Sequence, residues 1–177
     1  MNPNQTLISS LIRDVADFPK PGVVFKDITP LLADAAGYRA AIDELAASAP
    51  PGIDVVVGME ARGFIFAGPV ALALGAGFVP VRKPGKLPGD VYTESFALEY
   101  GEAALSVHTD AVLPGARVLV IDDVLATGGT IGATARLIQK LGAELVQVSV
   151  LMELSFLGGR QHLANLGITD TAAVLTV

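Results

Sequence analysis

The chain has 177 residues, a length that suits one domain with a sizeable core. It contains 12 basic and 18 acidic residues, and the resulting net charge of −6 argues against nucleic-acid binding over a broad surface. The absence of cysteine excludes disulfides, a thiolate metal site and a thiol nucleophile.

The first predicted element is an amphipathic helix over residues 5–16, because apolar residues recur there at helical spacing. These residues are Leu7, Ile8, Leu11, Ile12 and Val15. Prolines at positions 19 and 21 break the pattern, and residues 1–14 lack the basic and then apolar pattern of a secretory signal. A second, Ala-rich helix is predicted over residues 35–49 and ends at the Pro-Pro-Gly sequence that follows.

Alternating strands and helices are predicted for the rest of the chain. Short apolar runs predict buried parallel strands at residues 53–58, 78–82, 117–122, 144–152 and 172–177. Helices are predicted at residues 63–74 and from the Gly/Thr-rich turn after residue 122 to about residue 141. Residues 90–110, with Gly101 at their centre, predict a β-hairpin that stands off the sheet.

A mean hydropathy of +0.55 requires that a membrane span be considered. The longest uncharged stretch, residues 63–81, is long enough to cross a bilayer. It contains Pro69, Pro80 and four glycines, however, so a buried helix followed by a buried strand is the better interpretation. We therefore expect a cytoplasmic protein that makes no membrane contact.

The predicted fold is α/β, with an open, mainly parallel five-stranded sheet, helices on both of its faces and a projecting β-hairpin. One domain is expected to span residues 1–177. In such sheets the ligand binds beyond the carboxyl ends of the strands. Polar turns are expected at this edge after Gly58, after Arg82 and after Ile121.

The strongest motif is VLVIDDVLATGGT at residues 118–130, an apolar strand that ends in two acids and leads through an apolar spacer into a Gly/Thr-rich turn before a helix. Glycines let backbone N–H groups approach an anion, and the helix N-terminus adds partial positive charge. Two carboxylates can accept hydrogen bonds from vicinal hydroxyls, so the motif suits a sugar phosphate. A lone TGGT would more often be a strand end, an Asp turn and a Thr N-cap, but the strand, both acids and the apolar spacer in register disfavour that interpretation. A P-loop needs Lys where Gly129 stands, and the GxGxxG of a dinucleotide fold is missing.

Two basic segments follow strands. VGMEARGF at residues 57–64 carries Arg62, whose planar fork can pair with a diphosphate, although a surface salt bridge would explain it equally well. VRKPGKLPGD at residues 81–90 places three cations among prolines and glycines. A flexible basic loop of this kind can close over an anion, but on its own it also fits a solvated turn.

Together these motifs resemble the type I phosphoribosyltransferases. The resemblance assigns Asp122 and Asp123 to the ribose hydroxyls of phosphoribosyl pyrophosphate. It assigns the 5′-phosphate to five residues, Ala126, Thr127, Gly128, Gly129 and Thr130. It implies that Arg62 meets pyrophosphate beside a cis Glu60–Ala61 peptide, and that Lys83, with Lys86 nearby, lies on a mobile loop at the leaving group. Mg²⁺ held mainly through the substrate, with no protein metal site, and a homodimer are also implied.

The base is indicated by DFPKPGVVFKDITPL at residues 17–31, which by composition is only a proline-rich loop with aromatics. Together with Leu98-Glu99-Tyr100-Gly101, this segment resembles the adenine-specific group of the family. The resemblance implies a small N-terminal hood, roughly residues 1–35, in which Phe25 stacks on the purine while backbone groups of Val24 and Lys26 read its amine edge. Glu99 is the candidate for proton handling. The implied activity joins adenine to the phosphoribosyl group, giving AMP and pyrophosphate.

Two alternatives remain open. A phosphoribosyltransferase for another base is disfavoured by the hood segment. A non-catalytic sensor of phosphoribosyl pyrophosphate would be expected to carry a DNA-binding extension or a basic face, and neither is evident in the sequence. His108 and His162 have no partner at metal-ligand spacing, so we expect neither a catalytic nor a ligand role for them.

Overall fold

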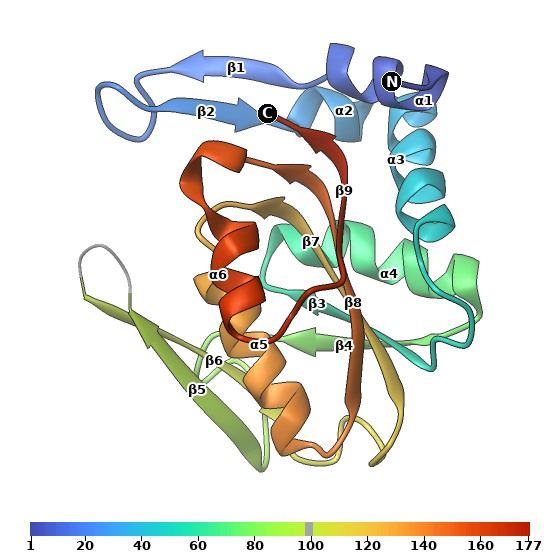
Figure 1. The fold of residues 1–177 in the computed structure, drawn as a ribbon, viewed down its shortest axis with the longest axis vertical. Helices are drawn as coiled ribbons and strands as arrows, with labels where there is room; N and C mark the ends of the chain where they lie inside the picture. Colours follow the sequence, from blue (N-terminus) through green and yellow to red (C-terminus); the bar gives the residue numbers. More distant parts are fainter. Residues whose placement is uncertain (98–100) are drawn as a thin grey trace.

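The computed structural model describes residues 1–97 and 101–177. A five-stranded parallel sheet forms its centre, with strand order β4-β3-β7-β8-β9 (Figure 1). The strands are β3 (Val55–Met59), β4 (Gly77–Val81), β7 (Arg117–Leu125), β8 (Glu144–Glu153) and β9 (Thr171–Thr176). The predicted parallel sheet of five strands is therefore confirmed.

Helices cover both faces of this sheet, as predicted (Figure 1). They are α3 (Ala35–Ala47) and α4 (Arg62–Leu74) on one face, and α5 (Gly129–Lys140) and α6 (Gly159–Asn165) on the other, with a 3₁₀ turn, η1 (Ser155–Leu157), before α6. Each face has its own apolar core, to which α4 contributes the fully buried Phe66 and α5 the fully buried Leu137. Burial on both faces explains why the strands are continuous apolar runs in the sequence.

The N-terminal segment differs from its prediction. It forms α1 (Pro3–Ser10), β1 (Arg13–Ala16), β2 (Val24–Asp27) and α2 (Thr29–Ala33). The helix predicted over residues 5–16 is therefore wrong beyond Ser10, because residues 13–16 pair in antiparallel register with β2 and Val15 lies opposite Phe25. The segment that composition described as a proline-rich loop likewise contains β2 and α2. Helical spacing reports a local pattern and does not reveal a strand partner across a turn.

This N-terminal layer lies beyond the carboxyl ends of β8 and β9, and the C-terminus ends close to β2 (Figure 1). The Gln5 side chain donates a hydrogen bond to the Val174 carbonyl oxygen of β9, at 3.0 Å. The sheet edge at which a ligand is expected is therefore covered on one side by β1 and β2.

The predicted hairpin is confirmed as β5 (Val91–Ala97) paired antiparallel with β6 (Glu102–His108). Two backbone hydrogen bonds between Arg82 and Ser106 join it to the end of β4. Glu94 pairs with Arg136 at 3.0 Å and with Lys140 at 2.6 Å, both on α5. The hairpin is thus fixed against the sheet and against α5. Of the LEYG motif, residues 98–100 lie outside the described part of the chain.

Strand β7 continues to Leu125, beyond its predicted end at residue 122. The reason lies in its neighbour, because β8 also continues and pairs Val124 with Met152 and Leu125 with Glu153. Both acids of the motif therefore lie inside the strand, whose last residue is Leu125. No helix of the described residues has the length and apolar character needed to cross a membrane.

Candidate functional site

Three turns meet at one edge of the sheet, because β3 pairs in parallel with both β4 and β7. The turn after β7, residues 126–128, leads directly into α5. Gly128 precedes the helix with a φ of 86°, a conformation that glycine adopts without strain, and no side chain of the described residues caps α5. A cavity of about 70 Å³ lies here, lined by Asp122 and residues 124–131. A helix start of this kind, with free N–H groups, is suited to bind an anion.

The two acids of β7 have different surroundings. Asp122 is half-buried, and its Oδ1 accepts a hydrogen bond from the Asp123 N–H at 2.9 Å. Asp123 is only 4% exposed, and its Oδ2 lies 2.7 Å from Nε of Arg62. The two carboxylates therefore have different partners, the Asp123 N–H for Asp122 and Arg62 for Asp123. Alternation along a strand directs successive side chains to opposite faces.

The pKa of Asp122 is raised well above its ordinary value. Burial disfavours its ionised form, and the neighbouring charge of Asp123 adds to this effect, while the cation of Arg62 acts in the opposite direction. Gly63 of α4 sits so close that a Cβ on it would lie 2.9 Å from Oδ1 of Asp122. The first turn of α4 therefore packs directly on this carboxyl group.

Arg62 joins the N-terminal layer to the sheet. Its guanidinium pairs with Asp123 and also lies over the Phe25 ring, 5.5 Å from the ring centroid. Phe18 meets the same ring edge-on at 5.2 Å. On either side of Phe25, Val24 is 54% exposed and Lys26 pairs with Asp14 at 2.7 Å.

The basic segment after β4 is anchored by Glu60, which the sequence analysis did not single out. Glu60 accepts hydrogen bonds from the Lys83 N–H at 3.0 Å and from Nε of Arg82 at 3.2 Å. Its pKa is lowered, mainly by the Lys83 N–H and also by Arg82. The Glu60–Ala61 peptide is cis, as the resemblance implies. The side chains of Lys83 and Lys86 are exposed, whereas Arg82 is half-buried and donates to the Lys86 carbonyl oxygen.

The structure thus brings together side chains from three elements: Phe25 of β2, Arg62 of α4, and Asp122 and Asp123 of β7, with the α5 start beside them. Lys83 lies on the neighbouring turn, where its backbone N–H donates to the Glu60 carboxylate. Glu99 lies outside the described residues.

Two further residues at this edge were not found from the sequence. Phe96 of β5 lies against the start of α5, where a Cβ on Gly129 would be 3.2 Å from its ring. Gly159 is buried against Ala126 from the opposite side. The sequence offered one local indication for each residue. The Gly158-Gly159 pair at a helix start could have suggested a close backbone contact at Gly159, and alternation along the hairpin strand could have suggested the inward position of Phe96.

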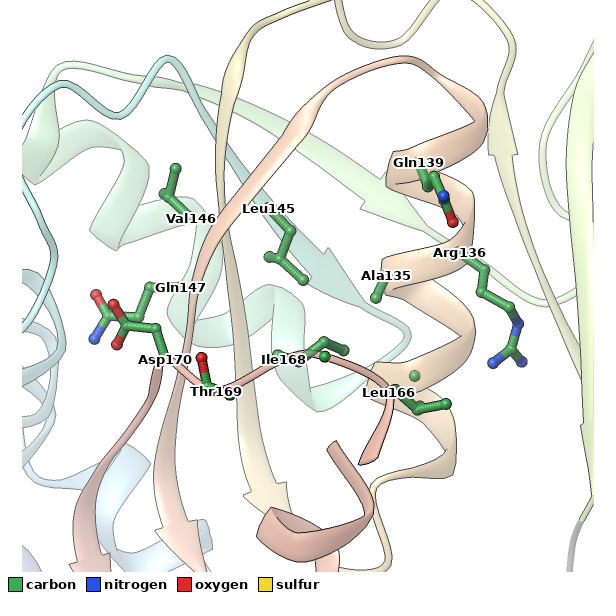
Figure 2. Close-up of a pocket in the computed structure, with 12 residues that line it drawn as sticks. Ala135, Arg136, Gln139, Leu145, Val146, Gln147, Leu166, Ile168, Thr169 and Asp170 are labelled. Carbon is green, nitrogen blue, oxygen red and sulfur yellow. The ribbon is translucent and has the colours of Figure 1, made fainter. Parts of the chain in front are cut away.

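A larger cavity, of about 420 Å³, lies between α5 and the beginning of β8 (Figure 2). Residues 145–147 line it at the amino end of that strand, so it lies toward the edge of the sheet opposite the three turns. Two charged residues line it: Arg136, which is already paired with Glu94, and Asp170, whose negative charge does not favour an anion. This cavity is therefore not the candidate site.

Among the described residues, no group of three His, Asp or Glu side chains is arranged to hold a metal ion. The carboxylate oxygens nearest the turn after β7 are those of Asp122 and Asp123, and such hard ligands suit Mg²⁺. Any cation at this site would need most of its ligands from a bound substrate.

Comparison with known proteins gives consistent results. The family model of the phosphoribosyl transferase domain matches residues 25–160. The chain is 68% identical to the adenine phosphoribosyltransferase of Cutibacterium acnes over 177 residues, which is 100% of both chains. The crystal structure of adenine phosphoribosyltransferase from Thermoanaerobacter pseudethanolicus is 46% identical with a TM-score of 0.93, covering 98% of this chain and 99% of that one. The Saccharomyces cerevisiae enzyme, complexed with an imino-altritol bisphosphate and adenine, is 34% identical with a TM-score of 0.89, covering 97% and 98%.

The raised pKa of Asp122 predicts that Asp122→Asn increases the free energy of unfolding at pH 7. Wild-type Asp122 must either ionise in a buried site or take up a proton on folding, and Asn does neither. Below the pKa of the unfolded chain, near 4, both states of the wild type are protonated, so the advantage of the variant should disappear there. Urea unfolding from pH 4 to pH 8 measures this, with the exposed Asp43→Asn as control. If the stability of Asp122→Asn relative to the wild type grew as the pH falls, the raised pKa of Asp122 would be contradicted.

Proposed function

Because the chain belongs to the adenine phosphoribosyltransferases of the phosphoribosyl transferase family, we propose that it transfers the 5-phosphoribosyl group from phosphoribosyl pyrophosphate to adenine, giving AMP and pyrophosphate. The observation that carries this proposal is the full-length identity with the Cutibacterium acnes enzyme. The geometry supports it, since an anion-binding helix start lies beside two carboxylates and a cation at one sheet edge.

The sugar phosphate is proposed to bind along the end of β7. Backbone N–H groups and hydroxyls of residues 126–130 take the 5′-phosphate, because they surround the small cavity at the start of α5. Asp122 and Asp123 take the ribose hydroxyls. Asp123 is paired with Arg62 in the unliganded protein, so its bond to the ribose forms beside a cation that is already in place.

Pyrophosphate is proposed to leave between the turns after β3 and β4. Arg62 and Lys83 stabilise its developing charge, and Lys86 adds a third cation on the exposed loop. N9 of adenine displaces pyrophosphate from C1′, and positive charge builds on the sugar ring. The protein contributes by orienting the two reactants and by stabilising charge. Glu99 is proposed to handle the proton of the purine.

The purine is proposed to lie against Phe25, with the N-terminal layer, residues 1–35, as the hood of a single domain. Val24 and Lys26 are two residues apart on the same strand, so their backbone groups face the same edge of β2 and can read one edge of a base together. This edge is on a two-stranded sheet, in which each strand has one unpaired side.

Mg²⁺ is proposed as the cofactor, held mainly by oxygens of pyrophosphate and ribose, with Asp122 and Asp123 as the nearby protein carboxylates. When bound, it neutralises part of the charge on the leaving group. A cytoplasmic location is proposed as well, because phosphoribosyl pyrophosphate and AMP are charged and cross an apolar membrane at high cost.

A homodimer is proposed because one side of the molecule exposes apolar surface. Leu72 of α4 is 83% exposed, and Phe78 of the edge strand β4 is 40% exposed. Beside Leu72 lies a groove of about 570 Å³, lined by Ala35, Tyr38, Arg39, Ile42, Pro69 and Ala73. Exposed apolar patches of this kind mark association surfaces.

The base assignment predicts that adenine is used at least ~100-fold more efficiently than hypoxanthine, because a site built to pair with one polar edge leaves buried groups unpaired with the other. The measurement is kcat/KM for adenine, hypoxanthine, guanine and uracil, each with phosphoribosyl pyrophosphate and Mg²⁺. Comparable values for adenine and hypoxanthine would refute the choice of base. Binding of phosphoribosyl pyrophosphate without turnover of any base would instead identify a sensor.

The metal assignment predicts that excess EDTA abolishes turnover and that added Mg²⁺ restores it. Elemental analysis of the substrate-free protein should find no tightly bound metal, because the described residues form no cluster of metal ligands. Full turnover in excess EDTA would contradict the proposed cation.

The dimer assignment predicts that the wild type sediments with twice the chain mass of 18.2 kDa and that Leu72→Lys shifts the equilibrium toward the monomer. A lysine in the proposed interface would have to be desolvated in both subunits. Leu113→Lys is the matched control, because Leu113 is also 79% exposed but lies outside the groove. Equal sedimentation of the two variants would place the interface elsewhere.

A further inference from the structure

The phosphate-binding turn has a second side, which faces away from the proposed ligand and rests on α6. The Leu154 N–H donates to the Leu125 carbonyl oxygen at 2.9 Å, so the chain leading into α6 is bonded to the end of β7. Gly159, the first residue of α6, is buried. A Cβ on it would overlap the Ala126 carbonyl oxygen and would lie 2.8 Å from Cδ1 of Leu125. The backbone of α6 is therefore in direct contact with the backbone of the turn.

The same helix also touches the first turn of α5. A Cβ on Gly128 would lie 3.1 Å from the Gly159 carbonyl oxygen and 3.2 Å from Cδ2 of His162. A Cβ on Gly132, one helical turn later, would lie 2.8 Å from Cδ1 of Leu166. Three glycines thus allow α6 to approach the start of α5 more closely than side chains would permit.

An ion pair holds α6 in this position. Arg160 lies next to Gly159 and makes hydrogen bonds through Nε and Nη2 to the Glu153 carboxylate at the end of β8, whose side chain is only 7% exposed. Its Nη1 donates to the Thr171 carbonyl oxygen at the start of β9. One guanidinium therefore fastens α6 to two neighbouring strands of the sheet.

Farther along α5 this support is reduced. Beyond Gly132, residues Ala135, Arg136 and Gln139 of the helix line the cavity of about 420 Å³ that lies between α5 and β8 (Figure 2). The contacts that α6 makes with α5 through Gly128 and Gly132 are accordingly concentrated at the end that carries the phosphate-binding turn.

We propose that α6 is a positioning element for the 5′-phosphate site. Gly159 and the Arg160–Glu153 pair support residues 126–128 on the side that faces away from the proposed ligand. The backbone N–H groups on the opposite side of this turn then converge on one phosphate. The inference rests on the proposed role of this turn in binding the 5′-phosphate. A glycine-containing turn has little rigidity of its own, and a shift of about 1 Å in a binding group can cost up to ~100-fold.

The test compares Gly159→Ala with Gly68→Ala. Both glycines lie in helices, but nothing lies within 4 Å of a Cβ added at Gly68, whereas one at Gly159 meets the turn. Titration calorimetry gives the dissociation constants of AMP and of adenosine, which lacks the phosphate. We expect Gly159→Ala to weaken AMP binding by at least about 10-fold and adenosine binding by no more than about twofold. Gly68→Ala should change neither constant.

Arg160→Met and Arg160→Lys provide a second measurement in case Gly159→Ala does not fold. Lysine keeps the charge but not the planar fork, so the ratio of the AMP and adenosine constants should lie between those of the wild type and of Arg160→Met. Urea unfolding of each variant identifies the fraction that is folded. A folded Gly159→Ala or Arg160→Met with the wild-type ratio would overturn the inference. A wild type that binds AMP no more tightly than adenosine would overturn the phosphate role of the turn itself.

Discussion

Parallel pairing of β3 with β4 on one side and β7 on the other is the constraint on which the rest of the structure depends. Parallel strands end at the same edge, so three polar turns that are far apart in the chain are brought side by side. Each turn brings one kind of group: Arg62 after β3, the basic loop after β4, and the anion-binding start of α5 after β7. The apolar cores on both faces hold this register.

The site concentrates charge in a region with little solvent. Asp122 and Asp123 are adjacent in one strand, and burial and mutual repulsion raise the pKa of Asp122. Arg62 offsets part of this cost through its contact with Asp123 and extends the pairing to the Phe25 ring. A positively charged side chain between the Asp123 carboxylate and an aromatic ring thus connects the end of β7 to the N-terminal layer.

Much of this arrangement could be predicted from the sequence, because its signals are local. The apolar runs of the strands, the DD…TGGT spacing and the hairpin around Gly101 each occupy one short stretch. The errors concern partners that are distant in the chain or on another element. Residues 13–16 form a strand only because β2 pairs with them, and β7 is longer than predicted because β8 continues beside it. The contacts of Glu60 with Lys83 and of Gly159 with Ala126 likewise cannot be predicted from the spacing of residues in the sequence.

The bonds of Glu60 have a consequence for the energetics of anion exchange. Its carboxylate accepts hydrogen bonds from the Lys83 N–H and from Arg82. An arriving anion that recruits these donors must displace an internal carboxylate, so the net affinity is the difference between two sets of charged hydrogen bonds. The same carboxylate is available to take the donors back when the anion departs. Such an internal competitor would lower the affinity for a multiply charged anion and would speed its dissociation.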